Sequence, residues 1–371
     1  MLKAIRSLST IAIGCLFPAM IVSAQTRGLE TFFVMSNNAD KNQVTEFVHT
    51  SDGTVIAKEA FDTRGRGTGG VNDPLEAQGS LTLSADHSLL FAANAGSGDI
   101  TIFQVIEGRL IFLDNQPSGG SNPVAVAQTQ NRLYVLNQGG AGSVVGFQMG
   151  YDGRLSPIAD STTFLSANAA GGSSISISPD GQTLAVVERL NDNIDTFHIN
   201  PNGTLGPIVV NHSAGVGAFS GRFAPDGKLI VSETGSSISA ISSYTVNSNG
   251  TLSAVTQSLT TNGEANCWNA IAPNGAFVYA SNAGSSNISG FSIGKSGALT
   301  ALNSSSIVAD NPEGATNLDI TTSGDGKFFY SLNAMVGTVG VFAIQPNGTL
   351  SEVEEIPGFT AAVGFNGIAA L

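Results

Sequence analysis

Short turns built on glycine recur along this chain at nearly constant spacing, and this repeat constrains the fold more than any other feature. Most of the turns are Asp-Gly or Asn-Gly between two apolar runs, and successive glycines are 45 to 55 residues apart; they are Gly53, Gly108, Gly153, Gly203, Gly250, Gly297 and Gly348. Asn-Gly and Asp-Gly supply the positive φ angles of tight hairpins, so each copy predicts one β-hairpin. A period near fifty in an all-β pattern is typical of propeller blades.

A second turn, Pro-Asp-Gly or a close variant, precedes most of these glycines by about twenty to thirty residues. Clear copies occupy residues 178–181, 224–227, 272–275 and 323–326. An apolar run follows each copy, for example Thr183 to Val187 or Phe277 to Ala280. Each repeat is therefore predicted to be strand A, turn, strand B, loop, strand C, glycine turn and strand D, which is a four-stranded blade.

The two ends of the chain predict how the ring closes. The first repeat lacks a strand A, because the apolar run Thr31 to Met35 resembles strand B of the other copies. Residues Gly367 to Leu371 resemble a strand A without a blade of their own. We therefore expect an all-β, seven-bladed propeller in which the C-terminal strand completes the N-terminal blade, leaving no open sheet edge at the junction.

The N-terminus predicts a secreted protein. Lys3 and Arg6 precede an apolar stretch from about Ile11 to Val22, and Val22-Ser23-Ala24 forms a small-residue cleavage site. We expect residues 1–24 to be a signal peptide and residues 25–371 a single propeller domain, secreted or, in a bacterial host, periplasmic. Hydrophobic residues make up 42% and charged residues 12% of the chain, as suits a β fold with short polar turns.

Charge and cysteine content limit the partners. The net charge is −13, which argues against binding to nucleic acid or to an anionic membrane, since both require basic patches. After removal of the signal peptide Cys267 is the single cysteine, so no internal disulfide is expected. We expect a monomer with a small-molecule ligand or substrate as its partner.

One position at the end of each strand B is polar in all seven repeats. Asn or Glu stands there, namely at Asn37, Asn94, Asn137, Glu188, Glu233, Asn282 and Asn333. The ends of strands B and the starts of strands A share one face of the disc, near the mouth of the central channel. The asparagines alone could simply cap turn amides. Glu188 and Glu233 could instead serve as general base and acid, or as ligands of a hard cation such as Ca²⁺.

Further candidates come from the starts of strands A and from the loops before them. Trp268 is the only tryptophan and could form an apolar wall for a ligand ring, although packing is the commoner role. Arg64, Arg66 and Arg189 could hold a substrate carboxylate, although a solvated loop arginine is commoner. We find no zinc-ligand spacing and no Ser-His-Asp constellation, and we predict no cofactor other than the alternative of Ca²⁺.

Together, the period, the two turns, the signal peptide and the segment from Gly67 to Leu75 resemble the seven-bladed lactonase family over the whole mature chain. That family includes propeller 6-phosphogluconolactonases and fungal 3-carboxymuconate cyclases. The resemblance implies a metal-free site at the channel mouth that opens or closes lactones with His, Arg and Glu side chains from neighbouring blades.

Glu233 matches the glutamate position of the family, but the basic positions differ. Ser173 or Ser174 stands where the enzymes have His, and Phe219-Ser220 stands where they have Arg-His. By their place in the repeat we count Ser173, Phe219 and Ser220 among the candidate substrate-binding residues, together with Asn94, Asn137 and Asn282. Phosphogluconolactone and carboxymuconate are anions that need cations to hold them, so this difference argues against both as substrates. Two hypotheses follow. One is a secreted lactonase-like or lactonizing enzyme, and the other is a non-catalytic propeller that acts as a binding or surface protein.

Overall fold

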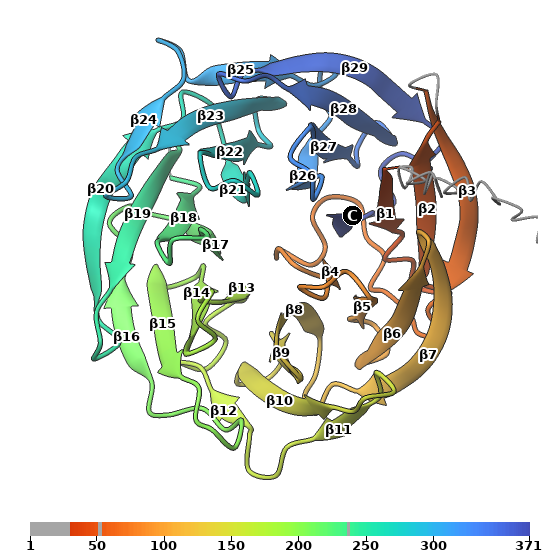
Figure 1. The fold of residues 1–371 in the computed structure, drawn as a ribbon, viewed down its shortest axis with the longest axis vertical. Coiled ribbons are helices and arrows are strands. Elements are labelled where there is room, and N and C mark those ends of the chain that lie inside the picture. The colour runs from red at the N-terminus through yellow and green to blue at the C-terminus, as the bar shows by residue number, and fades with distance from the viewer. Residues whose placement is uncertain (1–29, 51–53, 236–237) are drawn as a thin grey trace, which may run out of the picture.

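The strands of the computed structural model form seven sheets that follow one another around a ring (Figure 1). The structure describes residues 30–50, 54–235 and 238–371, and within them it contains β-strands and no α-helix. Neighbouring strands in each sheet are antiparallel, and each sheet has four strands in its main path. The predicted seven-bladed propeller is therefore confirmed. The predicted signal peptide and the Gly53 turn lie outside the described residues.

Every blade runs from an innermost strand at the channel to an outermost strand at the rim. In that order, blade one contains β30 (Ile368–Ala370), β1 (Thr31–Met35), β2 (Gln43–His49) and β3 (Val55–Asp62). Blade two contains β4 (Leu81–Leu83), β5 (Leu89–Asn94), β6 (Asp99–Ile106) and β7 (Arg109–Pro117). Blade three contains β8 (Pro123–Thr129), β9 (Arg132–Asn137), β10 (Ser143–Met149) and β11 (Leu155–Pro157), with β12 (Thr163–Phe164) also paired to β10. Blade four contains β13 (Gly172–Ile177), β14 (Thr183–Glu188), β15 (Asn193–His198) and β16 (Val209–His212).

The remaining three blades follow the same order. Blade five contains β17 (Ala218–Phe223), β18 (Leu229–Glu233), β19 (Ala240–Val246) and β20 (Leu252–Thr260). Blade six contains β21 (Asn266–Ile271), β22 (Phe277–Asn282), β23 (Asn287–Ile293) and β24 (Leu299–Ala301), with β25 (Ile307–Asp310) also paired to β23. Blade seven contains β26 (Asn317–Thr322), β27 (Phe328–Asn333), β28 (Thr338–Ile344) and β29 (Leu350–Pro357).

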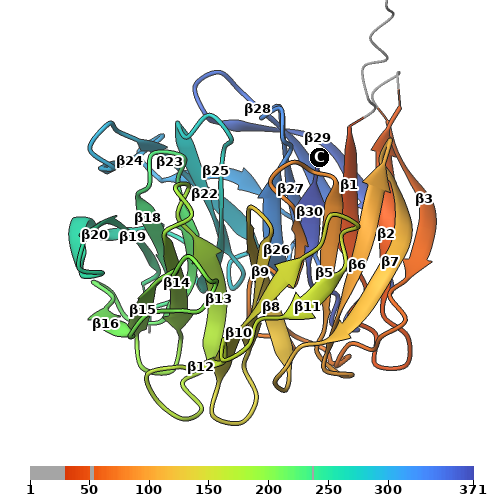
Figure 2. The same cartoon turned by 60° about the horizontal axis from the view of Figure 1, so that its bottom comes forward.

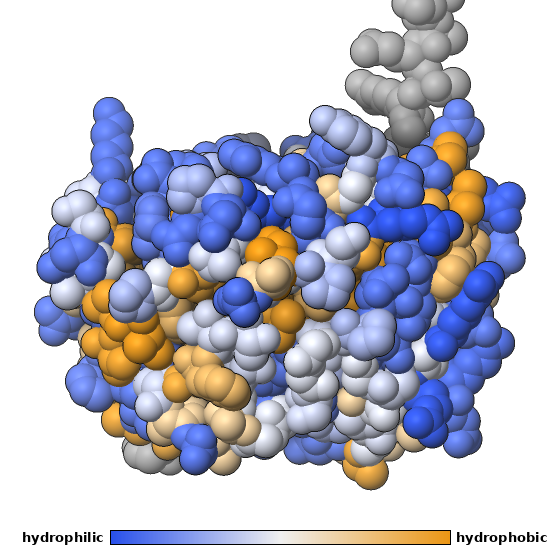
Figure 3. Space-filling view, turned by 90° about the horizontal axis from the view of Figure 1, so that it is seen from below, coloured by the Kyte–Doolittle hydropathy of each residue, from blue (hydrophilic) through white to orange (hydrophobic). Residues whose placement is uncertain are grey.

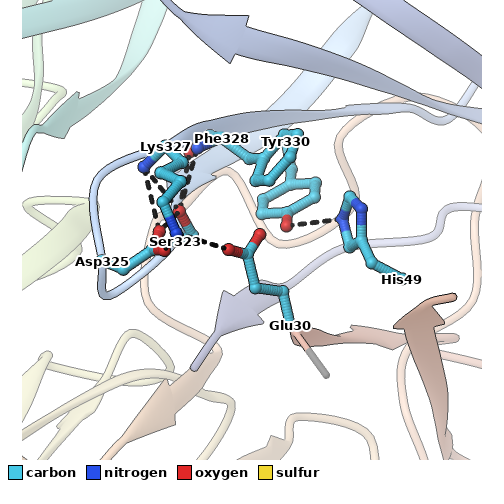
Figure 4. A network of polar contacts seen from close by, with 7 residues as sticks. All are labelled: Glu30, His49, Ser323, Asp325, Lys327, Phe328 and Tyr330. Atoms are coloured by element: carbon cyan, nitrogen blue, oxygen red, sulfur yellow. Dashed lines mark hydrogen bonds and ion pairs between the residues drawn. The ribbon is translucent and has the colours of Figure 1, made fainter. Parts of the chain in front are cut away.

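The C-terminal strand closes the ring as predicted. β30 pairs with β1, with Phe33 opposite Ala369, and the C-terminus lies beside β1 near the middle of the ring (Figure 1). Blade one also meets blade seven through side chains (Figure 4). Nζ of Lys327 lies 3.5 Å from Oε1 of Glu30, and Nε2 of His49 lies 2.9 Å from the Tyr330 hydroxyl. These contacts join the first and last repeats around an aromatic core.

The recurrent turn glycines are needed for contacts between blades as well as for the hairpins. The six described copies all have φ between 77° and 88°. The carbonyl of Gly203 accepts a hydrogen bond of 2.9 Å from the hydroxyl of Tyr134, one blade earlier, and Gly348 accepts one of the same length from Tyr279. A Cβ at Gly348 would lie 2.4 Å from the Phe277 ring. A side chain there would therefore push two blades apart as well as strain the turn.

Seen from a direction 60° away, the strands run across the thickness of the ring (Figure 2). The turns between strands A and B and between strands C and D lie on one face, which we call the turn face. The ends of strands B and the starts of strands A lie on the other, which we call the entry face. The outer wall is a mixture of hydrophilic and apolar areas (Figure 3). Within the described residues no helix has the length and apolar character that crossing a bilayer requires.

Candidate functional site

The seven polar residues at the ends of strands B are completely buried. Each has 0% exposed surface, and each lies in the second strand from the channel or at its end; they are Asn37, Asn94, Asn137, Glu188, Glu233, Asn282 and Asn333. Their side chains make hydrogen bonds inside the blades. Nδ2 of Asn94 donates to Oγ1 of Thr101 at 2.8 Å, and Nδ2 of Asn282 donates to Oγ of Ser289 at 2.8 Å. The asparagines therefore fasten loops and strands together, and no substrate could touch them in this conformation.

Glu188 holds the loop that enters blade four. The backbone N–H of Ser166 donates to Oε1 of Glu188 at 2.8 Å, the Ser166 hydroxyl bonds to Oε2, and Nδ2 of Asn191 donates to Oε2 at 2.7 Å. Asp195 lies beside Glu188, and each carboxyl group shifts the pKa of the other. Burial and then this neighbouring carboxyl raise the pKa of Asp195 to about 8, and the pKa of Glu188 is lowered by the hydrogen bonds it accepts, although burial opposes them.

Glu233 holds the loop that enters blade five in the same way. Its Oε1 accepts hydrogen bonds from the Ser213 hydroxyl at 2.8 Å, the Gly215 N–H at 2.8 Å and the Ser242 hydroxyl at 2.7 Å. Its Oε2 accepts one from the Ser258 hydroxyl at 3.1 Å. Among the described residues, the partners of Glu188 and those of Glu233 have no residue in common, and neither set contains an arginine. Each glutamate thus has its own set of partners, and the two sets do not merge into one site.

The three predicted arginines go to different places. The Arg64 guanidinium lies 3.6 Å above the centre of the Phe112 ring on the outer strand of blade two. Arg66 is exposed, and its backbone N–H donates to the Ser97 hydroxyl at 2.8 Å. Arg189 alone turns toward the channel, where it forms an ion pair with Glu76. Of the three, Arg189 is the one placed to meet a ligand at the channel.

The segment between β3 and β4 enters the middle of the ring (Figure 1). Gln78, near the end of this segment, is 1% exposed. Its Nε2 donates to the Asn269 carbonyl and to Oδ1 of Asp319, both at 3.0 Å, and its Oε1 accepts from the Ser220 hydroxyl and from the Asn269 N–H. Residues from blades five, six and seven are therefore tied together across the channel by a segment that precedes blade two.

This segment, together with strand pairing, covers the predicted substrate-binding residues at the starts of strands A. Ser173 donates its hydroxyl to the Phe219 carbonyl at 2.6 Å and is itself 0% exposed. Nε1 of Trp268 donates to the Ala77 carbonyl at 3.1 Å, and the Trp268 ring meets Phe219 edge to face with centroids 5.2 Å apart. Ser173, Phe219, Ser220 and Trp268 do gather around the channel, but they form its packed interior.

Asp73, Glu76, Arg189 and Cys267 lie at the entry face, and each of them is partly exposed. Oδ1 of Asp73 accepts hydrogen bonds from the Glu76 N–H at 3.0 Å and from Nδ2 of Asn366 at 3.2 Å. No hydrogen bond to Oδ2 of Asp73 is found within the described ranges. Burial raises the pKa of Asp73 to about 7, although the nearby Arg189 guanidinium lowers it. A carboxyl group with this pKa can donate or accept a proton near neutral pH.

Cys267 and Arg189 complete this group. Burial raises the pKa of the Cys267 thiol, and the Asp73 carboxylate nearby adds to the increase. The thiol therefore stays protonated at neutral pH and is a poor nucleophile. Arg189 has one buried donor, Nε, without a hydrogen-bond partner in the described part of the chain. The arrangement thus offers one titratable carboxyl, one cation with a spare donor, and a neutral thiol.

Sequence reasoning missed the role of Asp73, Gln78 and Asp319. Asp73 lies in the segment that carried the family resemblance, but nothing in its neighbourhood indicated that it would reach Arg189. Gln78 and Asp319 are separated by 241 residues and carry no motif. Their contact forms because the segment between β3 and β4 turns into the channel. The periodicity of the strands does not predict the path of such a segment.

In the described part of the chain, the predicted site residues neither form a metal cluster nor line a common groove. No three His, Cys, Asp or Glu side chains are grouped as a metal site would require, among the residues that the structure describes. A groove of about 870 Å³ lies between blades four and five on the turn face, lined in part by Asp180, His198 and Asp226. It lies on the opposite face from Asp73 and contains none of the predicted site residues.

Comparison with known proteins supports the fold and the resemblance to a lactonase family. The family model described as lactonase, 7-bladed beta-propeller, matches residues 141–267. A periplasmic gluconolactonase of Pseudomonas aeruginosa, PpgL, has a TM-score of 0.69 and 20% identity, over 92% of this chain and 99% of that one.

A Bacteroides fragilis structure, provisionally assigned as a 6-phosphogluconolactonase, has a TM-score of 0.72 and 19% identity, over 94% of this chain and 99% of that one. No sequence match to a curated protein is found. The seven-bladed ring and the matching segment together confirm the prediction from sequence that this chain resembles the seven-bladed β-propeller lactonases.

Proposed function

We propose that this protein is a secreted lactonase-type enzyme that acts on a small lactone, or on its open acid, at the entry face of the channel. The observation that carries the proposal is the Asp73 carboxyl, which has a pKa of about 7, one oxygen without a hydrogen bond in the described structure, and the Arg189 guanidinium nearby. The family match and the lactonase names of the structural neighbours support the reaction class.

The chemistry assigns one role to each group. As a general base, the Asp73 carboxylate takes a proton from water while the water oxygen attacks the lactone carbonyl carbon. The ring C–O bond of the tetrahedral intermediate then breaks, and the protonated Asp73 returns its proton to the leaving ring oxygen. Arg189 stabilises the developing oxyanion and the product carboxylate. Lactone and water are consumed and one hydroxy acid is formed, so atoms and protons balance.

The two glutamates that the sequence suggested, Glu188 and Glu233, take a different place in this proposal. Both are buried and accept hydrogen bonds from the loops beside them. We assign them a positioning role, because the loops that they hold flank Arg189 and the start of β17. The asparagines Asn94, Asn137 and Asn282 hold loops in the same sense, and we assign Ser173, Phe219, Ser220 and Trp268 to the packed wall beneath the site.

Hydrolysis of a lactone panel tests the proposal. The panel contains gluconolactone, neutral aliphatic lactones and a carboxylated lactone, and turnover by the purified protein is followed with and without a chelator. We expect turnover that Asp73→Asn lowers at least about a hundredfold, the low end of the usual contribution of a general base. Asp310→Asn, a change of the same kind at an exposed position of β25, is the control and should leave turnover unchanged. Turnover that survives in Asp73→Asn would refute the role of Asp73.

A non-catalytic binding propeller is the second candidate. It is favoured by the closure of the channel by Gln78 and by the serine and phenylalanine at the basic positions of the family. Absence of turnover on every lactone, combined with measurable binding of an unreacted lactone, would establish this second function instead.

A further inference from the structure

A cavity occupies the turn-face half of the central channel, on the other side of Gln78 from Asp73. Its volume is about 260 Å³, and it is lined by strands A of blades two, five, six and seven and by β30. Apolar walls come from residues such as Leu81, Ile271 and Ile320, and hydroxyl groups from Thr82, Thr321 and Thr322. Among the described residues of these walls stands a single charged side chain, Arg222.

The Arg222 guanidinium has no hydrogen-bond or ion-pair partner among the described residues, although a planar guanidinium carries five N–H donors. Nη2 lies close to Gly79, since a Cβ built on that glycine would be 3.7 Å from Nη2 and 3.8 Å from Oγ1 of Thr82. The Nη2 donor of Arg222 therefore lies on the side of the cavity where Thr82 and Gly79 meet. Burial lowers the pKa of Arg222, yet an arginine stays charged at any ordinary pH.

The charge of Asp319 acts on Arg222, but within the described residues the two side chains form no ion pair. Its Oδ1 already accepts hydrogen bonds from Nε2 of Gln78 at 3.0 Å and from its neighbour Ile320 N–H at 2.9 Å. Its Oδ2 accepts one from the Ile368 N–H at 3.2 Å. Three donors fix the carboxylate in the channel wall. It acts on Arg222 only through its charge, and the guanidinium is left with donors that a ligand can use.

We propose that this cavity binds a small monocarboxylate, with its carboxylate held by the Arg222 guanidinium and its remaining atoms between the threonine hydroxyls and the apolar walls. A guanidinium matches a carboxylate in a two-point geometry, and the partial burial of Arg222 strengthens that contact. The Asp319 charge nearby disfavours a dianion such as phosphate. The volume suits a short acid or hydroxy acid and excludes a polymer. The site is separate from the Asp73 group and does not depend on the proposed lactonase reaction.

Isothermal titration at neutral pH with acetate, glycolate and gluconate, and with inorganic phosphate for comparison, tests the site. We expect saturable binding of at least one carboxylate, with affinity at least about tenfold lower in Arg222→Gln, because the two-point contact is lost. Arg222→Lys keeps the charge without the fork and should bind with intermediate affinity. Arg109→Gln removes an exposed arginine of the outer strand β7 and should bind as the unaltered protein does.

Two further variants keep the test decisive. Thr321→Phe fills the cavity without altering Arg222, so it should abolish binding even if Arg222→Gln fails to fold. Asp73→Asn should bind the carboxylate normally, which separates this site from the proposed catalytic one. The fluorescence of Trp268, the only tryptophan, gives a second readout, because its indole N–H bonds to the Ala77 carbonyl two residues from Gly79. Absence of saturable carboxylate binding, unchanged affinity in Arg222→Gln, or a preference for phosphate would overturn the proposal.

Discussion

Asp195 and Glu188 place two carboxyl groups against each other in the interior of blade four, and the backbone N–H of Ser166 donates to both, at 3.2 and 2.8 Å. Only one of the two can be ionised at low cost, since like charges in contact repel. The proton resides on Asp195, whose pKa burial and Glu188 raise to about 8. Folding therefore takes up a proton here, and stability depends on pH.

The Asp195 proton predicts greater stability at acidic pH. Its folded pKa lies above that of an aspartate in an unfolded chain, so the stability it provides is complete below about pH 4 and is lost as the pH rises through about 8. Asp195→Asn mimics the protonated form. We expect its melting temperature to match the unaltered protein at pH 5 and to exceed it by at least about 2 °C at pH 9. Asp310→Asn should show no such gain, and melting temperatures at pH 9 that are equal for Asp195→Asn and the unaltered protein would contradict the raised pKa of Asp195.

Asp73 and Arg189 predict the pH profile of the proposed reaction. A general base acts only when ionised, so kcat/KM should rise with pH through about 7, the pKa of Asp73. Arg189 lowers that pKa, and its removal in Arg189→Gln should move the midpoint upward by about one pH unit. Arg189→Lys should restore part of the shift. A midpoint that stays in place in Arg189→Gln would separate Arg189 from the titrating group.

Glu233 allows the positioning role to be distinguished from a catalytic one. Glu233→Gln keeps the shape but weakens four hydrogen bonds that now benefit from the negative charge. We expect a loss of about 1 to 3 kcal/mol in the free energy of unfolding, measured with denaturant, and little change in kcat once the variant is folded. Turnover abolished without loss of stability would return Glu233 to the catalytic role that the sequence suggested.

The hydrogen bonds of Gln78 to three blades lead us to predict that the channel interior contributes strongly to the free energy of unfolding. Gln78→Ala removes the hydrogen-bond partner of the Ser220 hydroxyl, two hydrogen bonds of the Asn269 backbone and one donor to Asp319, all in a buried site. We expect the free energy of unfolding to fall by about 2 to 4 kcal/mol in urea. Gln104→Ala, on the exposed side of β6, is the matched control and should cost less than about 0.5 kcal/mol. A similar small loss in both variants would show that the contacts of Gln78 are not needed to hold the blades.

The success and failure of the sequence predictions have a physical explanation. The blade order and the closure by β30 follow from local rules, since Gly203 or Gly348 needs a positive φ in its own turn and the neighbouring apolar runs must be strands. The ends of strands B were aligned correctly for the same reason. The burial of these strand ends was not predictable. Glu188 and Glu233 are covered by loops whose sequences do not follow the repeat. The position of Arg222 in β17 likewise carries no motif. That its guanidinium faces a cavity without a partner among the described residues becomes visible only in the assembled ring.

The last prediction concerns the contribution of β30, the strand that closes the ring, to stability. β30 supplies the inner neighbour of β1, the Ile368 N–H bonds to Oδ2 of Asp319, and the Leu371 carbonyl accepts a hydrogen bond of 2.9 Å from the Gly324 N–H. Removing residues 368–371 would expose the edge of β1 and leave the Asp319 carboxylate short of a donor.

We expect this truncation to lower the melting temperature by more than about 10 °C and to promote aggregation, as measured by calorimetry and light scattering. Removing Leu371 alone leaves β30 in register with β1 and should cost much less. Because the blades meet in a closed ring, loss of one inner strand also loosens the contact between blades one and seven. A truncated protein that melts like the full chain would mean that the ring is held by packing between blades, and that strand pairing at the closure adds little.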